Sequence, residues 1–477
     1  MPSAKPEMPA EAAKPTRSTG LPQDVGQCHA MIVSLVEQLA QIQEQLDELK
    51  DRAGLNSRNS SKPPSSDGPQ VGKRARSGTG RKRGGQVGHP GAYRALVEAE
   101  QLTEVVEVHP ESRCECGAQV VELQEPRRHQ VFDLPERVQA EVSEYRLYRG
   151  VCAGCHKAHA AKMPAGVPQG QLGPRALGAI GVLSTQYHLT VAKVQGVLRE
   201  FMGLEFSVGA ISNAQGLISQ ALKAPVHQAQ AQVRDAAVVH MDETRYPCQG
   251  LKTNYAWVTV EPRVVTLSML PTRARLGAES LLGLEPKAAV VSDRYAVYDY
   301  VPDAQHQVCW AHLVRDFERI AQRSGVAGAI GRRLVTLSWV VFDWHKRAKT
   351  AVQYEPIQRR IKSLLAQARL SGCKRTARTA GNLLSQWDTL WLFTTRADVE
   401  PTNNAAERAI RTLVLKRKIS GPARSRRGLE FVARGYSVVQ SCVLQGRSAL
   451  GLITDSVRHW LGQAVAPTCL RPAPATG

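Results

Sequence analysis

Two aspartates follow apolar runs of the sequence, and their positions suit the binding of a divalent metal ion. Asp242 follows AAVVHM, and Asp293 follows AAVVS, so each should lie where a buried strand meets the surface. If the two strands are neighbours, the two carboxylates converge at one edge of a sheet. Carboxylate oxygens suit Mg²⁺ or Mn²⁺, and a pair of such ions clamps the attacking and leaving oxygens of a phosphoryl transfer. Glu243 should point to the opposite strand face and have at most a supporting role.

A third carboxylate lies in the basic stretch VEPTNNAAERAIRTLVLKRK, residues 399–418. Residues 408–427 contain eight Lys or Arg and no Asp or Glu. Glu407, on an expected helix, is the candidate third metal ligand. On its own it reads equally well as an ion-pair partner of Arg411, four residues later.

Other polar residues could support these carboxylates. We expect Asn403 and Asn404 to begin the helix of Glu407, and Asn403, on the same face, to touch metal-bound water or DNA. In the stretch CWAH, Cys309 and His312 have a spacing that could bind Zn²⁺, but no matching second pair is near. We expect instead that a helix start presents His312 to the carboxylates, where it orients a phosphate or the nucleophile. A packed Cys and a capping His are the plain alternative.

The composition points to a polyanionic partner. The chain has 477 residues and a formal net charge of +20. Nucleic acid is the commonest polyanion, although attachment to a ribosome or to a membrane surface would also fit the charge alone. No run approaches eighteen uninterrupted apolar residues, and the N-terminus lacks the apolar core of a signal peptide. We therefore expect no membrane span and a cytoplasmic, nucleoid-associated protein.

The N-terminal quarter divides by composition. We expect residues 1–25 to be disordered, residues 26–52 to form a short coiled coil, and residues 53–100 to be a basic, disordered DNA-binding linker. The coiled coil rests on heptad spacing of Ile32, Leu35, Leu39, Ile42, Leu46 and Leu49, and an amphipathic helix packed on its own protein is the alternative. The linker cations that we expect to contact phosphates are Arg74, Arg76, Arg81, Lys82 and Arg83.

Four cysteines lie in the β-like stretch 101–165, which reads as a zinc-ribbon-like module. They form two pairs, CEC and CAGC, at Cys114, Cys116, Cys152 and Cys155. Four thiolates on turns give a closed tetrahedral structural Zn²⁺ site. The first pair has only one residue between its thiols, so a nearby histidine, His156 or His159, could replace one thiolate. The alternative is a ribbon that has lost its metal.

The rest of the chain reads as an α/β core with helical additions. Three strands, a helix, a strand, a helix and a further short strand match the order of a ribonuclease-H-like domain. We therefore expect a multidomain α/β protein with a ribonuclease-H-like mixed sheet. Its parts are helices at 170–225, which form either a helix-turn-helix or a plain helical layer, the core at 236–320 and 396–430, a helical insertion at 321–395, C-terminal helices at 431–465 and a tail at 466–477.

Several motifs occur together in an order that resembles a known family. LNSRNSSKPPSSD with GRKRGGQVGHPG, the leucine heptads before it, CECG with CAGC, then MDET, SDRYAVY, CWAHLVRDF and NNAAERAIR resemble blocks of the insertion-sequence 66 family of bacterial transposases. The family usually has two residues between its first two cysteines, and this chain has one. The resemblance covers nearly the whole chain, except residues 1–25 and the last few.

The resemblance implies a DDE transposase with a ribonuclease-H-like catalytic core. The acidic triad of the family corresponds to Asp242, Asp293 and Glu407, which would bind two Mg²⁺ or Mn²⁺ ions per active site. The implied chemistry is hydrolysis at the element ends and attack of the resulting 3′-hydroxyl on target DNA. The implied partners are double-stranded DNA, further copies of this chain in a dimer or larger assembly, and accessory transposition proteins.

The cations around Glu407 then have separate expected functions. Arg408 and Arg411 would hold phosphates beside the metal ions, and Lys416, Arg417 and Lys418 would follow the DNA backbone. Two other functions remain open from the sequence. One is a catalytically silent DNA-binding protein derived from a transposase, and the other is a ribonuclease-H-like nuclease that cuts without strand transfer.

Overall fold

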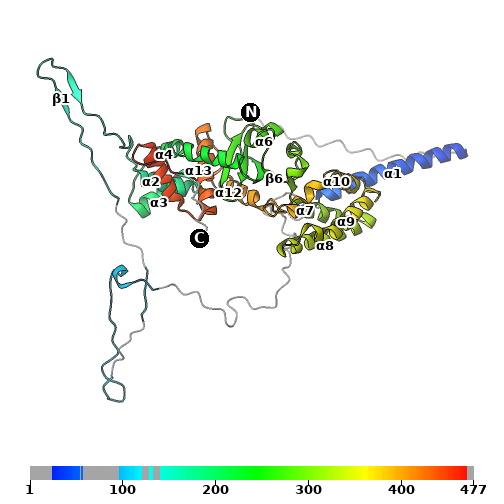
Figure 1. Cartoon of the computed structure of the whole chain (residues 1–477), viewed down its shortest axis with the longest axis horizontal. Coiled ribbons are helices and arrows are strands. Elements are labelled where there is room, and N and C mark those ends of the chain that lie inside the picture. Colours follow the sequence, from blue (N-terminus) through cyan, green and yellow to red (C-terminus); the bar gives the residue numbers. More distant parts are fainter. Residues whose placement is uncertain (1–23, 54, 57–95, 121–127, 133–139, 470–477) are drawn as a thin grey trace, which may run out of the picture. The chain divides into compact units, whose positions relative to one another are not determined.

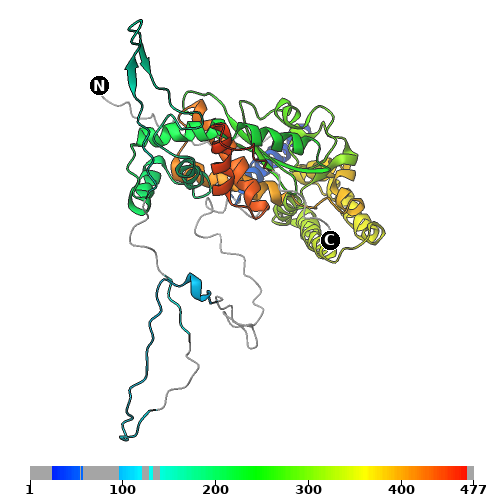
Figure 2. The same cartoon turned by 60° about the vertical axis from the view of Figure 1, so that its left-hand side comes forward.

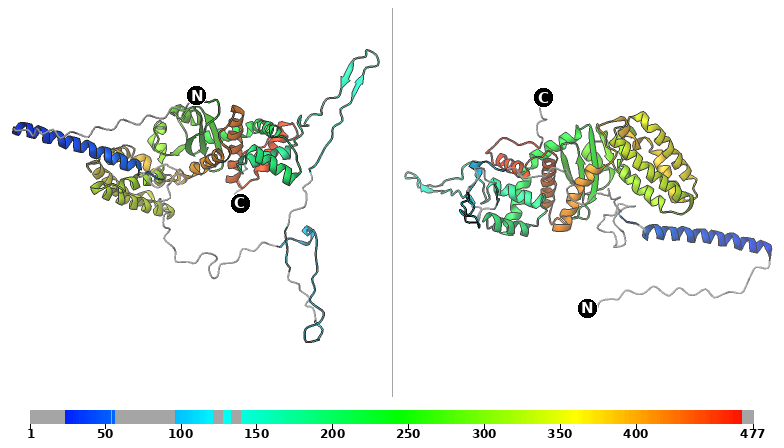
Figure 3. Two further views of the ribbon diagram at one scale, coloured as in Figure 1. Left: turned by 180° about the vertical axis from the view of Figure 1, so that it is seen from behind. Right: turned by 90° about the horizontal axis from the view of Figure 1, so that it is seen from below.

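The computed structural model describes most of the chain in two compact units. The units are Met1–Gly72 and Lys73–Gly477, and each is considered by itself. Figure 1 shows the elements along the chain, and Figures 2 and 3 show them from other directions. The described residues are 24–53, 55–56, 96–120, 128–132 and 140–469.

Two of the predicted segments fall largely outside this part of the chain. The predicted disordered start is described only at residues 24–25, and the basic linker only at 53, 55–56 and 96–100. The five linker cations predicted to contact DNA lie outside the described residues, namely Arg74, Arg76, Arg81, Lys82 and Arg83.

One long helix forms the described part of the first unit. α1 (Val25–Ala53) extends the predicted heptad segment by one residue at each end. Its six heptad side chains are between 43% and 64% exposed, so no described residue of the first unit covers the apolar stripe that the heptads predict. An uncovered stripe on an isolated helix is marginal in water, which is consistent with a need for a partner.

The second unit contains a two-stranded hairpin and a five-stranded mixed sheet. The hairpin pairs β1 (Arg149–Val151) with β2 (Ala158–Ala160) in antiparallel fashion. The sheet has the order β5-β4-β3-β6-β7, in which β3, β4 and β5 form the expected antiparallel meander, and β6 and β7 continue parallel to β3. The bounds are β3 (Val238–Arg245), β4 (Tyr255–Val260), β5 (Val265–Leu270), β6 (Ala289–Ser292) and β7 (His306–Val308).

Alternate residues of the central strands enter two hydrophobic cores, one on each sheet face. Val239, Met241 and Val290 belong to the first core, whereas Val238, Ala289 and Val291 belong to the second. Such strands, buried on both faces, read as continuous apolar runs. This is why AAVVHM and AAVVS were recognisable as strands.

Helices cover both faces of the sheet (Figure 3). The first core takes in α2 (Pro174–Thr185), α3 (Val191–Met202), α4 (Val208–Ala221), α5 (Lys223–Arg234), α6 (Arg275–Leu282), α12 (Asn404–Ser420), α13 (Arg426–Leu444) and α14 (Ala449–Trp460). The second takes in α7 (Trp310–Ala321), α8 (Gly325–Lys346), α9 (Ala351–Arg369), α10 (Lys374–Ser385) and α11 (Leu392–Thr395). Short 3₁₀ turns occupy Ala99–Gln101, Ala296–Tyr298, Asp303–Gln305 and Asp388–Leu390.

The predicted helical insertion, 321–395, is formed by α8 to α11 between α7 and α12. α8 packs closely against the end of α7, because a Cβ at Gly331 would overlap the backbone of Ile320 and Ala321. Among the described helices, α8 is long and apolar enough to cross a membrane by length and composition. Its buried Ile330, Leu334 and Val341, however, belong to the second core with α7 and α9.

The helices at 170–225 form a packed layer. Thr190 and Ser207 cap α3 and α4 by accepting the N–H groups of Lys193 and Ala210, as serine and threonine commonly do at helix starts. α4 contacts α2, α13 and α14, which cover it from several sides. This packing favours the plain helical layer over a helix-turn-helix that presents α4 to DNA.

Two predicted boundaries near the C-terminus are wrong. The division between 430 and 431 falls inside α13, which covers the edge strand β5: the Ser441 and Ser437 hydroxyls accept the N–H groups of Val265 and Leu267 at 3.0 and 2.8 Å. The edge strand needs this helix to satisfy its backbone.

The predicted loose tail also begins too early. Gln445 donates to the Cys469 carbonyl at 2.6 Å, Arg447 donates to the Thr468 carbonyl at 3.0 Å, and Cys469 is buried. The tail prediction for 466–477 is therefore wrong at residues 468–469, and residues 470–477 lie outside the described part of the chain.

Candidate functional site

The two aspartates stand at the same level of two neighbouring parallel strands. β3 and β6 are paired with His240 opposite Val291. Continued by two residues, this register places Asp242 opposite Asp293, and both then face the side of the sheet that carries α7. Asp293 directly follows β6, as predicted, but Asp242 lies within β3, which continues to Arg245. The two carboxylates are therefore brought together by the register of β3 and β6. The expectation that each aspartate ends its strand is correct for Asp293 and wrong for Asp242.

Both carboxylates are held by nearby backbone N–H groups. Asp242 Oδ1 accepts the N–H of Glu243 at 2.9 Å, and Asp293 Oδ1 accepts the N–H of Tyr295 at 3.0 Å. Burial raises the pKa of Asp242 well above its usual range, and the charges of Glu243, Asp293 and Glu407 raise it further. The site therefore concentrates negative charge that a bound cation would offset.

Glu243 belongs to a buried network on the other strand face. Its carboxylate accepts the Tyr298 hydroxyl at 2.5 Å and pairs with Arg273 at 2.8 Å. Burial raises the pKa of Glu243, partly offset by these two partners. Arg273 also lies over the Tyr295 ring, at 4.3 Å from its centre. The arrangement ties the strand of Asp242 to the loop that follows Asp293.

Asn403 fixes the start of the helix that carries Glu407. Its side chain donates to the Met241 carbonyl at 2.6 Å, its Oδ1 lies 3.3 Å from His240 Nδ1, and its N–H donates to Cys309 Sγ at 3.1 Å. The residue is 1% exposed. The expectation that Asn403 touches metal-bound water or DNA is therefore not supported, because its polar groups face β3 and the start of α7. Asn404 begins α12 and is exposed.

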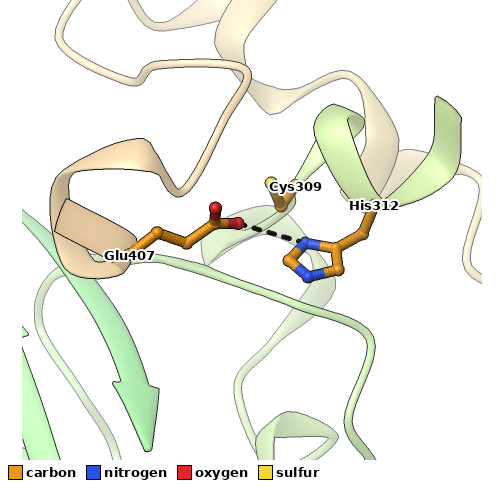
Figure 4. Close-up of side chains that lie close together, drawn as sticks. All are labelled: Cys309, His312 and Glu407. Carbon is orange, nitrogen blue, oxygen red and sulfur yellow. Dashed lines mark ion pairs between the residues drawn. The ribbon is translucent and has the colours of Figure 1, made fainter. Parts of the chain in front are cut away.

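Glu407 projects from α12 toward the first turn of α7 (Figure 4). Its Oε1 lies 3.6 Å from His312 Nδ1, and its Oε2 lies 3.8 Å from Arg315. Its ion pair is thus formed with Arg315 of α7, and among the described residues no ion pair joins it to Arg411 of its own helix. Burial and the charge of Arg315 lower the pKa of His312, which favours the neutral ring. The expected presentation of His312 toward the carboxylates matches this geometry.

One group of three potential metal ligands occurs in the described part of the chain. Cys309 Sγ, a His312 ring nitrogen and a Glu407 oxygen lie within 4.8 Å of one another. His312 Nδ1 and Glu407 Oε1 are buried and have no hydrogen-bond partner. Leaving a buried polar atom without a hydrogen-bond partner costs free energy. A further ligand bound to these two atoms would remove that cost.

The cations of α12 differ in accessibility. Arg408, Arg411 and Lys418 are exposed, and Arg417 donates to the carbonyl of Arg245. Lys416 is 8% exposed, its ammonium donates to the Leu189 carbonyl at 3.0 Å, and burial lowers its pKa to about 8. The predicted DNA contact of Lys416 is therefore not supported, because its charge is directed into the helical layer.

The four N-terminal cysteines lie in two separate tight turns. The Cys114 carbonyl accepts the Gly117 N–H at 2.8 Å, and the Cys152 carbonyl accepts the His156 N–H at 2.8 Å. Neighbouring backbone N–H groups lower the pKa of the Cys114 and Cys152 thiols. No three of these thiols form a ligand group within 4.8 Å among the described residues, so zinc binding by the two pairs stays a prediction.

Arg315, Arg273 and Tyr298 were missed by sequence reasoning. Arg315 could have been found, since it lies three residues after His312 and shares its face of the helix. Arg273 and Tyr298 could not, because they reach Glu243 from segments 30 and 55 residues away.

Comparisons with known proteins match two families and two uncharacterized relatives. The family described as Transposase IS66 family matches residues 169–431, and a family of unknown function (DUF6444) matches residues 14–95. Uncharacterized protein y4hP of Sinorhizobium fredii is 23% identical over 389 residues, covering 72% of this chain and 69% of that protein. Uncharacterized protein y4qI of the same organism is 24% identical over 401 residues, covering 75% and 72%.

The transposase match spans the whole mixed sheet, the helical insertion and α12. It contains the three acidic residues and covers more than half of the chain. The chain therefore belongs to the IS66 family of transposases.

Proposed function

We propose that the protein is a DDE transposase that cleaves DNA at the ends of an insertion sequence and transfers those ends into target DNA. The observation that carries this proposal is that Asp242 on β3 and Asp293 directly after β6 stand at the same level of adjacent parallel strands, with Glu407 near enough for its charge to affect Asp242. Family membership supports the transposase role.

The strand order supports a ribonuclease-H-like core. An antiparallel meander continues into two parallel strands, and helices cover both faces. In this architecture the first strand is central and lies next to the first parallel strand, so acidic residues on these two strands meet. The helical segment at 321–395 is then an insertion that separates the third carboxylate from the first two in sequence.

The three carboxylates suit a pair of Mg²⁺ or Mn²⁺ ions. Oxygen ligands fit these hard cations. A bound cation would stabilise the charged form of Asp242, whose pKa is raised, and would give Glu407 Oε1 the partner that it lacks. Ligands of a two-metal site are spread over ions about 3.5–4 Å apart, so the carboxylates need not share one coordination shell. When bound, the ions activate the attacking oxygen and stabilise the leaving oxygen of an in-line displacement.

The chain's own residues would position the DNA in both chemical steps. Asp242, Asp293 and Glu407 hold the ions, while Arg315 orients the Glu407 carboxylate from α7. Neutral His312 orients a phosphate or the nucleophile. Arg408 and Arg411, exposed on α12 beside Glu407, hold phosphates that flank the scissile bond. The same site serves hydrolysis and strand transfer, because both are in-line displacements at phosphorus.

The helical insertion supports binding of a long DNA duplex. Residues 321–395 contain thirteen Lys or Arg and three Asp or Glu, which contribute +10 of the formal charge of +20. Cations on such a surface release counterions from DNA when they contact its phosphates, and this release favours binding. The basic linker would add a second contact region.

Self-association and structural zinc complete the proposal. The exposed heptad stripe of α1 would join two copies as a coiled coil. One Zn²⁺ would draw the two cysteine turns together as a zinc ribbon, with the acidified Cys114 and Cys152 thiols as ligands. Accessory transposition proteins would act together with this protein in the cytoplasm, at the nucleoid.

Cleavage of element-end DNA tests the proposed function. The purified chain is incubated with a labelled duplex that carries the inverted repeats flanking its gene, in Mg²⁺ and in EDTA. We expect Mg²⁺-dependent nicks that leave 3′-hydroxyls, and joining of pre-cleaved ends to a second duplex. Binding without any nick would identify a silent DNA-binding protein, and nicking without joining would identify a nuclease. Either result would overturn the transposase proposal.

A further inference from the structure

We propose that Cys309, His312 and Glu407 form a binding site for Zn²⁺, and that zinc bound there withdraws Glu407 from the Mg²⁺ site. Binding at the three residues stands on their geometry alone. Its effect on cleavage rests on the proposed function.

The three ligand atoms are already near the spacing that zinc requires. Zn–S and Zn–N bonds of about 2.3 and 2.0 Å in a tetrahedron place ligand atoms roughly 3.3–3.8 Å apart. His312 Nδ1 and Glu407 Oε1 are 3.6 Å apart, and all three ligand atoms lie within 4.8 Å of one another. A contraction of about 1.5 Å at most therefore completes the set, and water takes the fourth position.

The ligand types select zinc over magnesium. A thiolate and an imidazole suit borderline-soft ions, whereas Mg²⁺ prefers oxygen ligands alone. One thiolate and one carboxylate neutralise the charge of Zn²⁺, and binding releases the thiol proton to solvent. The nearest cation, Arg315, contacts the other carboxylate oxygen, Oε2, and leaves Oε1 available.

The surrounding backbone holds the ligands in place. Cys309 follows β7, and its own N–H donates to the Ser292 carbonyl at 2.8 Å. The Asn403 N–H donates to Cys309 Sγ at 3.1 Å, as outer groups commonly do to metal-bound thiolates. The Trp310 N–H donates to the Pro401 carbonyl at 2.9 Å, which joins the start of α7 to the segment before α12. The site thus rests on two elements fixed to each other.

Zinc at this position would compete with the catalytic arrangement. Glu407 has one carboxylate, and an Oε1 that is bound to zinc beside Cys309 and His312 is no longer available to an ion held by Asp242 and Asp293. We therefore expect zinc to inhibit Mg²⁺-dependent cleavage, and the inhibition to require the Cys309 thiol.

Cobalt titration tests binding without reference to cleavage. The four cysteines of the two N-terminal turns are replaced by serine in the full chain, so that they cannot bind the probe. We expect Co²⁺ to produce a thiolate-to-cobalt charge-transfer band that saturates at one ion per chain and disappears when Zn²⁺ is added. C309S should lose the band, and H312A should weaken binding by more than the roughly 10–100-fold typical of outer-shell changes.

Two matched controls accompany these variants. Cys373 stands at the N-terminal cap of α10 as Cys309 does at that of α7, and His345 lies 3.2 Å from Glu400. C373S and H345A should leave the band unchanged. Circular dichroism melting checks that each variant folds. No band in the parent, or an unchanged band in folded H312A and C309S, would overturn the site.

Cleavage rates with and without zinc separate the two proposals. Each variant is compared with its own zinc-free rate, and we expect zinc to slow the parent and spare C309S. Zinc binding with no cleavage under any condition would overturn the transposase function and leave the site standing. Cleavage with no charge-transfer band would overturn the zinc site and leave the transposase function standing. Equal inhibition of the parent and C309S would overturn the link between them.

Discussion

Asn403 shows how a single residue ties the candidate site together. Its amide joins α12 to the backbone of β3, and its N–H contacts the thiol that precedes α7. Glu407 then follows one turn later. A residue that sequence reasoning assigned to metal-bound water or DNA instead positions the third carboxylate.

Replacement of Asn403 should destabilise the protein, whereas replacement of its neighbour should not. N403A leaves the Met241 carbonyl without its donor in a buried environment, which costs about 1–3 kcal/mol. N404A removes an exposed side chain and should change the free energy of unfolding by less than about 0.5 kcal/mol. Urea unfolding monitored by tryptophan fluorescence measures both. Equal midpoints for the two variants would contradict the anchoring role.

His306 should make stability fall in mild acid. Burial lowers its pKa to about 4 from 6.5, and its Nε2 lies 2.8 Å from Ser292 Oγ. Between these values the unfolded chain binds a proton that the folded chain does not, so the contribution of His306 is lost as pH falls through this window. The loss reaches about 3 kcal/mol at most. Between pH 7 and 4, measured in EDTA, the free energy of unfolding should fall less steeply for H306Q than for the parent. Equal slopes of the two curves against pH would refute this.

The candidate site was predictable from sequence only in part. Asp242 and Asp293 were visible because each follows an apolar run that must be a strand. The Cys309–His312 spacing was visible too, but Glu407 lies 95 residues beyond His312 in the chain. Only the fold shows that Glu407 faces this pair and that Lys416 is turned away from solvent.

The contact between α7 and α8 fixes the helical insertion on the sheet. It depends on Gly331, whose missing Cβ leaves room for the backbone of Ile320 and Ala321. Helical periodicity does not reveal such a contact. Glycine lowers helix propensity wherever it occurs, so the pattern does not distinguish a glycine that allows close packing from one that does not.

Two glycine substitutions with opposite effects test this contact. G331A should destabilise the protein by about 1–3 kcal/mol through overpacking against backbone. A Cβ added at Gly381, inside α10, would meet no neighbouring atom within 4 Å, so G381A should be neutral or stabilising by about 0.5–1 kcal/mol. Thermal unfolding compares the two. A neutral G331A would show that α7 and α8 are not so closely packed.

The basic surface of the insertion should contribute to DNA affinity. Arg359 and Arg360 are exposed on α9. R359Q/R360Q should weaken binding of any duplex and reduce the slope of log affinity against log salt by about 0.9 for each phosphate that is no longer neutralised. Fluorescence anisotropy at several salt concentrations measures this, with Q358A as a control that changes no charge. An unchanged slope would exclude α9 from the DNA-binding surface.

At the scale of the whole molecule, the order of elements was predictable and their junctions were not. The meander, the two parallel strands and the helical insertion follow from the lengths and spacing of apolar runs. The boundary inside α13 was misplaced because the Ser437 and Ser441 hydroxyls that bind β5 look like ordinary polar residues. The tail was misplaced because Thr468 and Cys469 are held by carbonyl contacts, which leave no pattern in sequence.

Self-association should depend on the first unit. No described residue of the first unit covers the α1 stripe, and burial of such a stripe is the driving force for a coiled coil. Replacing Leu35, Leu39 and Ile42 by serine should lower the mass measured by light scattering toward that of one chain. Replacing Gln38, Gln41 and Gln45 by serine is the control. An unchanged mass in the leucine variant would contradict a coiled coil.

Mg²⁺-dependent cleavage by E407Q, compared with E430Q, tests the central claim most directly. Glu407 faces α7 and its charge raises the pKa of Asp242, whereas Glu430 pairs with Arg434 on α13. We predict that E407Q reduces formation of 3′-hydroxyl ends by more than about 100-fold, beyond an outer-shell effect. DNA binding should change little, and E430Q should cleave like the parent. Cleavage by folded E407Q at the parent rate would contradict the account.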